Sequence, residues 1–161
     1  MTDQDPDQPE SLTHDEEEAL RVMRELCEAS GLQMNAELRA RHAPYLDVEL
    51  TGPDAPATFG RHGQPLDALQ YLANLIIARR VAGEVRVILD AGGYRARRAD
   101  TLTRLAREYA AEVKARQEEC ELDPLPAHER RIIHNALLDD PDVRTYSEGD
   151  DPDRRVIIAP R

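Results

Sequence analysis

The spacing of apolar residues switches between a helical period and a strand period several times along this 161-residue chain. The first helical stretch runs to about Ser30, with Thr13 or Asp15 as its cap and Gly31 at its end. Alternating apolar and polar residues then predict two strands, at 32–40 and 45–50, joined by a turn at 41–44 into an antiparallel hairpin. The residues expected to face the core are Leu32, Met34, Ala36, Leu38, Ala40, Leu46, Val48 and Leu50.

A second helical period begins directly after the sequence Gly60-Arg61-His62-Gly63 and runs to about Arg80. Pro65 fits the first turn of this helix, where its missing N–H removes no hydrogen bond. Gly83 ends the helical pattern, and a third alternating run follows. The core residues predicted for this helix and strand are Leu66, Leu69, Leu72, Ala73, Ile76, Val85, Val87 and Leu89.

The remaining two fifths of the chain begin with a long helix predicted from about Tyr94 to Glu118. A shorter helix at 127–138 follows, and then two strands at 143–147 and 155–159 that a Gly/Asp/Pro turn connects. Helices that cover one face of a small sheet satisfy the two-layer rule. The pattern therefore predicts an α+β protein with two modules joined by the long helix.

Charge is distributed unevenly, although the net charge of −11 argues at first against nucleic acid. Residues 1–18 hold eight acidic residues and no lysine or arginine, and we expect residues 1–14 to form an acidic disordered tail. Residues 60–110 hold nine arginines against five acidic residues, which is compatible with a local nucleic-acid surface. The alternative explanation for the many arginines is a genome that favours arginine over lysine, since the chain has a single lysine.

Other compositional features exclude several protein classes. The two cysteines do not indicate a disulfide scaffold, and no apolar run approaches the roughly 20 residues of a membrane span. No signal peptide is visible, so a cytoplasmic location is expected. The five histidines show no zinc-type spacing, and no nucleophile–base pair is marked. The sequence therefore predicts a non-enzymatic protein with no metal and no cofactor.

The glycine pair before the second helix is the first candidate for chemistry. Amides at a helix N-terminus are unpaired and lie at the positive end of the dipole, and glycine lets a phosphate approach them closely. Glycine pairs before helices are more often plain turns. A P-loop is excluded because no Gly-Lys-Ser/Thr sequence occurs. What remains is the GxxG loop that clamps about four nucleotides of single-stranded backbone in KH modules.

Two further groups of side chains are candidates for phosphate contacts. Arg95, Arg97 and Arg98 lie near the start of the long helix, where they either contact phosphates or form a solvated face with charge pairs. Arg130 and His134 are four residues apart on one face of the shorter helix. Such a pair, taken alone, is best interpreted as two solvent-exposed side chains with no binding role.

Together these features resemble the Jag-type RNA-binding proteins of bacteria, also called KhpB or SpoIIIJ-associated proteins. The resemblance covers roughly residues 15–161 and is strongest at 60–75, 85–105 and 129–158. It implies a type II-like KH domain at 15–92, followed at 93–161 by a linker helix and a small α/β domain with its core at about 119–161. This second domain, called here the R-three-H domain, takes its name from an Arg-x-x-x-His signature.

The resemblance also implies site residues and partners. The GxxG loop falls on Gly60, Arg61, His62 and Gly63, and the Arg-x-x-x-His signature falls on Arg130 and His134. The implied ligand is single-stranded RNA, with single-stranded DNA as an alternative. The implied role is that of an RNA chaperone or post-transcriptional regulator connected to cell-wall synthesis and cell shape through a small KH-only partner protein.

Some residues depart from the family pattern. Phe59 stands where an aliphatic residue is usual and Pro65 where a threonine is usual, and His62 is largely neutral at pH 7. These departures weaken the expected phosphate grip. The alternative hypothesis is a protein-interaction scaffold whose KH and R-three-H folds bind RNA weakly or not at all.

Overall fold

The computed structural model describes residues 11–161, which fold into two compact units. The first unit ends at Tyr94, and the second comprises Arg95–Arg161. Most of the expected acidic tail, residues 1–10, lies outside the described residues, and residues 11–13 lead directly into the first helix. Within 11–161, no helix combines the length and apolar character needed to cross a bilayer.

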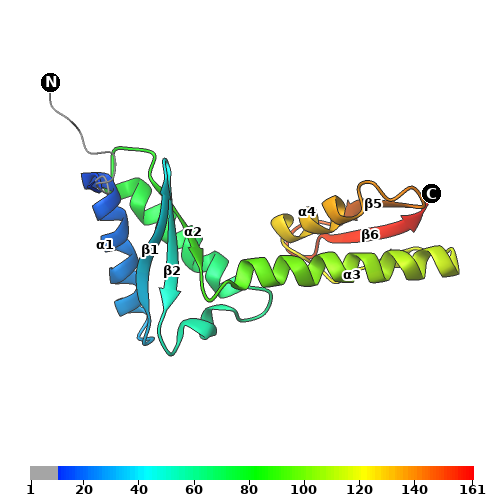
Figure 1. Ribbon diagram of the computed structural model, residues 1–161, viewed down its shortest axis with the longest axis horizontal. Coiled ribbons are helices and arrows are strands. Elements are labelled where there is room, and N and C mark those ends of the chain that lie inside the picture. The colour runs from blue at the N-terminus through cyan, green and yellow to red at the C-terminus, as the bar shows by residue number, and fades with distance from the viewer. Residues whose placement is uncertain (1–10) are drawn as a thin grey trace, which may run out of the picture. The chain divides into compact units, whose positions relative to one another are not determined.

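The first unit places two helices on one face of a three-stranded sheet (Figure 1). Its elements are α1 (His14–Ala29), β1 (Asn35–His42), β2 (Tyr45–Thr51), the 3₁₀ helix η1 (Ala55–Thr58), α2 (Gln64–Arg80) and β3 (Arg86–Asp90). The strand order is β1-β2-β3, in which β2 is antiparallel to β1 and parallel to β3. The predicted element order and the antiparallel hairpin are confirmed.

The start of α1 is fixed by a capping box, so Thr13 is the cap. The Glu16 amide donates to Thr13 Oγ1 at 3.3 Å, and the Thr13 amide donates to Glu16 Oε2 at 2.7 Å. Arg41 Nε of β1 donates to the other oxygen of Glu16 at 2.7 Å. Burial would raise the pKa of Glu16, but the hydrogen bonds from Thr13 and Arg41 bring that pKa below its ordinary value. The carboxylate therefore joins helix cap and sheet.

The residues that alternation selects are buried or pack half-buried against the core, with two exceptions. Leu46, Val48, Leu50, Val87 and Leu89 are at most 2% exposed. The inward positions predicted at the two ends of the first strand, Leu32 and Ala40, are wrong because both are exposed. The first precedes β1, and the second follows an irregularity in register after Leu38. A bulge of this kind shifts the following side chains to the opposite face.

Helix α2 carries apolar residues on more than one face. Leu66, Ala73 and Ile77 are fully buried, whereas Leu72 and Leu75 are 43% and 47% exposed. The prediction that Leu72 faces the core is therefore wrong. Tyr71 is 72% exposed, so α2 presents an apolar outer face about two to three turns after the GxxG loop.

The second unit packs two helices against another small sheet (Figure 1). Helix α3 (Tyr94–Arg116) begins at the last residue of the first unit and is followed by β4 (Cys120–Glu121), α4 (Ala127–Ala136), β5 (Val143–Glu148) and β6 (Arg155–Pro160). The strand order is β4-β6-β5, antiparallel throughout. The predicted helices and the β5–β6 pair are confirmed, whereas the short strand β4 has no periodic signal in the sequence. The α+β class is confirmed.

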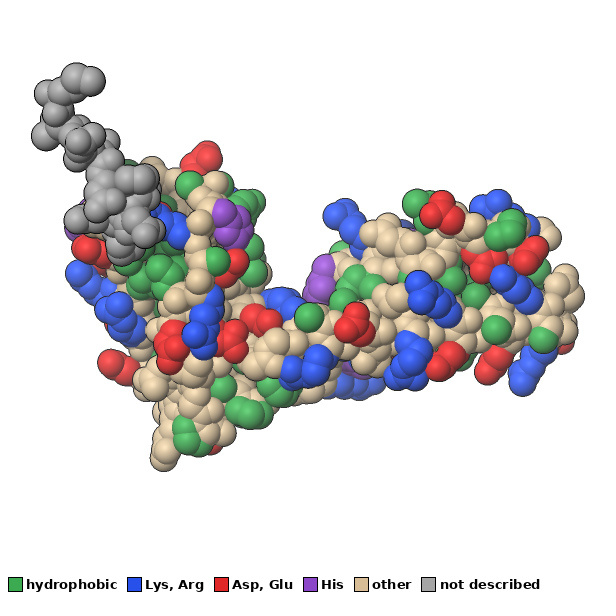
Figure 2. All heavy atoms as spheres, in the orientation of Figure 1, with side chains coloured by type: hydrophobic (Ala, Val, Ile, Leu, Met, Phe, Trp, Pro, Cys, Tyr) green, Lys and Arg blue, Asp and Glu red, His purple; other side chains and the backbone are tan. Residues whose placement is uncertain are grey.

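Charge on the visible face does not form one basic patch. Figure 2 shows Lys and Arg side chains interspersed with Asp and Glu over each unit. Acidic and basic residues that are separated along the sequence are therefore mixed in space on this face.

Candidate nucleic-acid interface

Both glycines of the GxxG loop are required by the fold of the first unit. Gly60 and Gly63 have φ angles of +44° and +73°, in the left-handed region that favours glycine. A Cβ on Gly60 would lie 2.6 Å from Cδ of Pro65, and one on Gly63 would lie 2.6 Å from Cε1 of Tyr94. Each glycine therefore accommodates a ring of the protein itself. His62, with a φ of +58°, is also left-handed.

The loop amides divide into two groups. The Gly63 amide donates to the Phe59 carbonyl at 2.7 Å, and the Gln64 amide donates to the Arg61 carbonyl at 3.1 Å. The expectation that the buried Gly63 amide faces a phosphate is therefore wrong, because the loop closes on itself. The amides of Gly60 and Arg61 have no acceptor within residues 11–161. These two amides remain as the predicted phosphate donors.

An aromatic pair supports the base of the loop. The rings of Phe59 and Tyr94 stack with centroids 4.9 Å apart and planes 14° from parallel. Phe59 thus fixes the entry to the loop, and Tyr94 packs on Gly63. Sequence analysis assigned no role to this pair, because 35 positions separate two residues that show no joint pattern.

Of the three candidate arginines near the start of α3, Arg98 has a partner in its own unit. Its Nε and Nη2 groups donate to the two carboxylate oxygens of Glu129 at 2.8 and 3.1 Å. Glu129 is only 1% exposed, so this bidentate pair neutralises a buried charge of α4. The fold thus accounts for Arg98 without a phosphate. Arg97 is exposed and Arg95 half-buried, and both remain predicted phosphate contacts.

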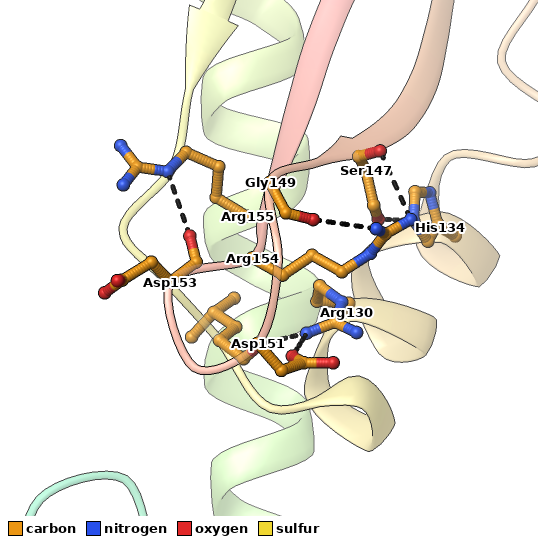
Figure 3. Close-up of polar contacts among 9 residues, drawn as sticks. Arg130, His134, Ser147, Gly149, Asp151, Asp153, Arg154 and Arg155 are labelled. Atoms are coloured by element: carbon orange, nitrogen blue, oxygen red, sulfur yellow. Dashed lines mark hydrogen bonds and ion pairs between the residues drawn. The ribbon is translucent and has the colours of Figure 1, made fainter.

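Arg130 of the Arg-x-x-x-His signature is buried rather than solvent-exposed. It is 7% exposed, and its Nη1 group donates to the Leu125 carbonyl at 2.6 Å and to Asp151 Oδ1 at 2.8 Å. The guanidinium therefore connects the segment before α4 with the turn between β5 and β6 (Figure 3).

His134 is held by two hydroxyl groups of β5. Its Nδ1 lies 2.7 Å from Oγ1 of Thr145, and its Nε2 lies 2.9 Å from Oγ of Ser147. Thr145 and Ser147 alternate along the strand and so face the same side of the sheet. Burial, together with the positive charge of Arg130, lowers the pKa of His134. The imidazole is therefore neutral at pH 7, and it anchors α4 to β5.

The contact between Ser147 and His134 has the distance of a nucleophile–base pair, which sequence analysis did not detect. A catalytic histidine of this type needs an acidic group on its other nitrogen to stabilise the imidazolium. Here the other nitrogen contacts the neutral hydroxyl of Thr145. Arg130 disfavours the imidazolium further by lowering the pKa of His134. The geometry therefore favours a structural anchor over a proton acceptor.

Arg154 is a third basic residue at this site, and sequence analysis missed it. Its Nη1 donates to the Gly149 carbonyl at 2.8 Å and its Nη2 to the Ser147 carbonyl at 3.4 Å. Figure 3 shows its side chain running toward Ser147 and His134. Two guanidinium groups and two hydroxyl groups are thus grouped around the imidazole. Such donors suit a phosphodiester or a ribose.

Known proteins match both units of this chain. Residues 100–160 match the family model of the R-three-H domain. The second unit is therefore similar to the R-three-H domain. This is the domain that the resemblance implies, and Arg130 and His134 lie inside the matched residues. The match does not extend to the GxxG loop, so the KH identity of the first unit remains a prediction.

Three similar proteins carry the name RNA-binding protein KhpB. The one from Clostridium symbiosum is 35% identical over 145 residues, which are 89% of this chain and 65% of that protein. The one from Lactiplantibacillus plantarum is 46% identical over 102 residues, 63% of this chain and 32% of the relative. The one from Bacillus subtilis is 35% identical over 112 residues, which are 68% of this chain and 54% of that protein. The chain thus spans about one third to two thirds of the length of these relatives.

Proposed function

We propose that this chain binds single-stranded RNA through one site on each unit and catalyses no reaction. The observation that carries the proposal is the alignment of 145 residues, across both units, with a relative named RNA-binding protein KhpB. In this proposal the first unit is a type II-like KH domain, and the second unit is the R-three-H domain with α3 as its linker helix.

The proposed site on the first unit is the exposed half of the GxxG loop. The amides of Gly60 and Arg61 donate to a phosphate, and the exposed guanidinium of Arg61 adds positive charge. The N-terminus of α2 adds its dipole. The outer face of α2, with Tyr71, Leu72 and Leu75, then offers apolar surface to the unstacked bases that follow.

The proposed site on the second unit is the group around His134. Arg154 and the solvent-facing edge of Arg130 contact phosphate oxygens, while the neutral His134 holds the helix and strand that carry them in register. Each site alone makes few contacts. Two sites on one chain gain from effective concentration when one RNA reaches both.

The cellular role and the partners are proposed from the resemblance alone. They are an RNA chaperone or post-transcriptional regulator in the cytoplasm, a connection to cell-wall synthesis and cell shape, and a small KH-only protein as partner. Single-stranded DNA is the alternative nucleic-acid ligand.

A protein-interaction scaffold is the second candidate function. The observation that favours it is the exposed apolar face of α2, since contiguous exposed apolar residues also mark protein interfaces. A titration of the isotopically labelled chain with an unstructured RNA oligonucleotide, followed by amide NMR, separates the two functions. If the chain binds RNA, the amide resonances of Gly60, Arg61 and Arg154 should shift. If no resonance shifts at low salt, the protein-interaction scaffold is the better interpretation.

A further inference from the structure

The contact between Arg130 and Asp151 joins two groups of very different exposure. The Arg130 side chain is 9% exposed, whereas the Asp151 side chain is 66% exposed. Arg130 extends from α4 and is also held by the Leu125 carbonyl, so its guanidinium has a fixed position. Asp151 lies in the β5–β6 turn, and Figure 3 shows its carboxylate beside the Arg130 guanidinium. The carboxylate is therefore the member of the pair that can leave.

The guanidinium of Arg130 retains unused donors beside this carboxylate. Both of its contacts involve Nη1, and no acceptor within residues 11–161 contacts Nε or Nη2. In the same part of the chain no buried side-chain nitrogen or oxygen is without a partner, so these N–H groups reach solvent. A guanidinium binds phosphate best through two parallel N–H groups. Asp151 occupies one of the donors that this arrangement needs.

We propose that Asp151 occupies the phosphate site of Arg130 in the free protein, and that an RNA phosphodiester binds there by replacing the carboxylate. The proposal rests on the RNA-binding function proposed above. The ligand exchange is balanced in charge, since a carboxylate and a phosphodiester each carry one negative charge. The exposed carboxylate is well solvated, so its contact with Arg130 contributes little and is readily exchanged.

The same turn provides a matched control residue. Asp150 is exposed, and its carboxylate has no partner among residues 11–161. Asp150→Asn and Asp151→Asn each remove one negative charge from neighbouring positions. Their effects on the general electrostatic attraction of RNA are therefore similar. Only Asp151→Asn removes the charged competitor from Arg130.

The test compares the RNA affinity of the wild-type chain and the two variants at low salt, by fluorescence anisotropy with an unstructured RNA. We expect Asp151→Asn to bind about two- to fivefold more tightly than Asp150→Asn, the range typical of an ion pair whose carboxylate is solvent-exposed. Equal affinities of the two variants, with RNA binding intact, would overturn this inference alone. No binding by any of the three proteins would overturn it together with the proposed function.

A second readout does not depend on variants. In the wild-type chain, saturating RNA should shift the carbon-13 resonance of the Asp151 side-chain carboxyl group, because this group exchanges Arg130 for water. The Asp150 resonance serves as the internal reference. Bound RNA that leaves the Asp151 resonance at its free position would contradict the exchange.

Discussion

Reversing charge at the two middle positions of the GxxG loop tests the first proposed site without changing its glycines. Substituting either glycine would perturb the fold, because an added Cβ would lie 2.6 Å from a neighbouring ring in each case. Arg61 is exposed, and asparagine and aspartate tolerate the left-handed conformation of His62. The variant is Arg61→Asp with His62→Asp. The matched control is Arg61→Asn with His62→Asn, which removes the same side chains without adding negative charge.

The expected loss follows from the change in charge near the bound phosphate. The acidic variant alters the charge of the loop by three negative units, two at Arg61 and one at His62. At a separation of about 6 Å in water, each unit costs roughly 0.7 kcal/mol at low salt. The sum of about 2 kcal/mol corresponds to a roughly 30-fold weaker affinity for RNA. The asparagine control removes one positive charge and should bind about threefold more weakly than wild type.

Fluorescence anisotropy at low salt measures this difference, and circular dichroism checks that both variants remain folded. The roughly tenfold gap between the acidic variant and its control should shrink as salt is added, since salt screens the repulsion. Equal affinities of the acidic variant and its control would show that no phosphate lies near this loop.

Three further predictions concern the supports of the two sites. Arg98→Ala should lower the free energy of unfolding by about 3–5 kcal/mol, because it leaves the Glu129 carboxylate buried and unpaired. Chemical denaturation measures this loss. The control is Arg104→Ala, which removes an exposed ion pair and should lower the free energy of unfolding by at most about 0.5 kcal/mol. The pKa of His134 is lowered in the folded chain, so the unfolded chain takes up the proton first and stability should fall as pH drops below about 6.5. For His134→Gln the free energy of unfolding should change less over the same pH range. Identical pH dependence in the variant and the wild-type chain would show that His134 does not cause the loss of stability at low pH. Gly63→Ala should lower the melting temperature, since its φ of +73° and the nearby ring both disfavour a Cβ.

Local features of the fold could be predicted from the sequence because their causes are local. The Thr13 cap depends on a glutamate three residues later, and the strand faces depend on alternation within five or six residues. The bulge after Leu38 could not be predicted, since a change in pairing register leaves no mark on composition. The packed face of α2 was also ambiguous, because apolar residues lie on more than one side of it.

The sequence motifs of the candidate sites could be predicted, but the burial and the partners of their side chains could not. The GxxG and Arg-x-x-x-His spacings marked the correct segments of the chain, yet neither shows which donors face solvent. Arg130 pairs with a carboxylate 21 residues away, and Arg98 pairs with one 31 residues away. Such long-range partners follow from the packing of α3, α4 and the β5–β6 turn. A sequence pattern contains no information about the approach of these elements.

The proposed RNA binding depends most directly on phosphate contacts made by the folded chain, and the salt dependence of RNA affinity measures them. Anisotropy titrations of the wild-type chain with an unstructured RNA, repeated over a series of salt concentrations, give the slope of log affinity against log salt. Each phosphate contact to a single strand contributes about −0.7 to this slope. One contact in each unit therefore predicts a slope of about −1.4 or steeper. Binding that does not change with salt, or no binding at the lowest salt, would contradict the proposed function.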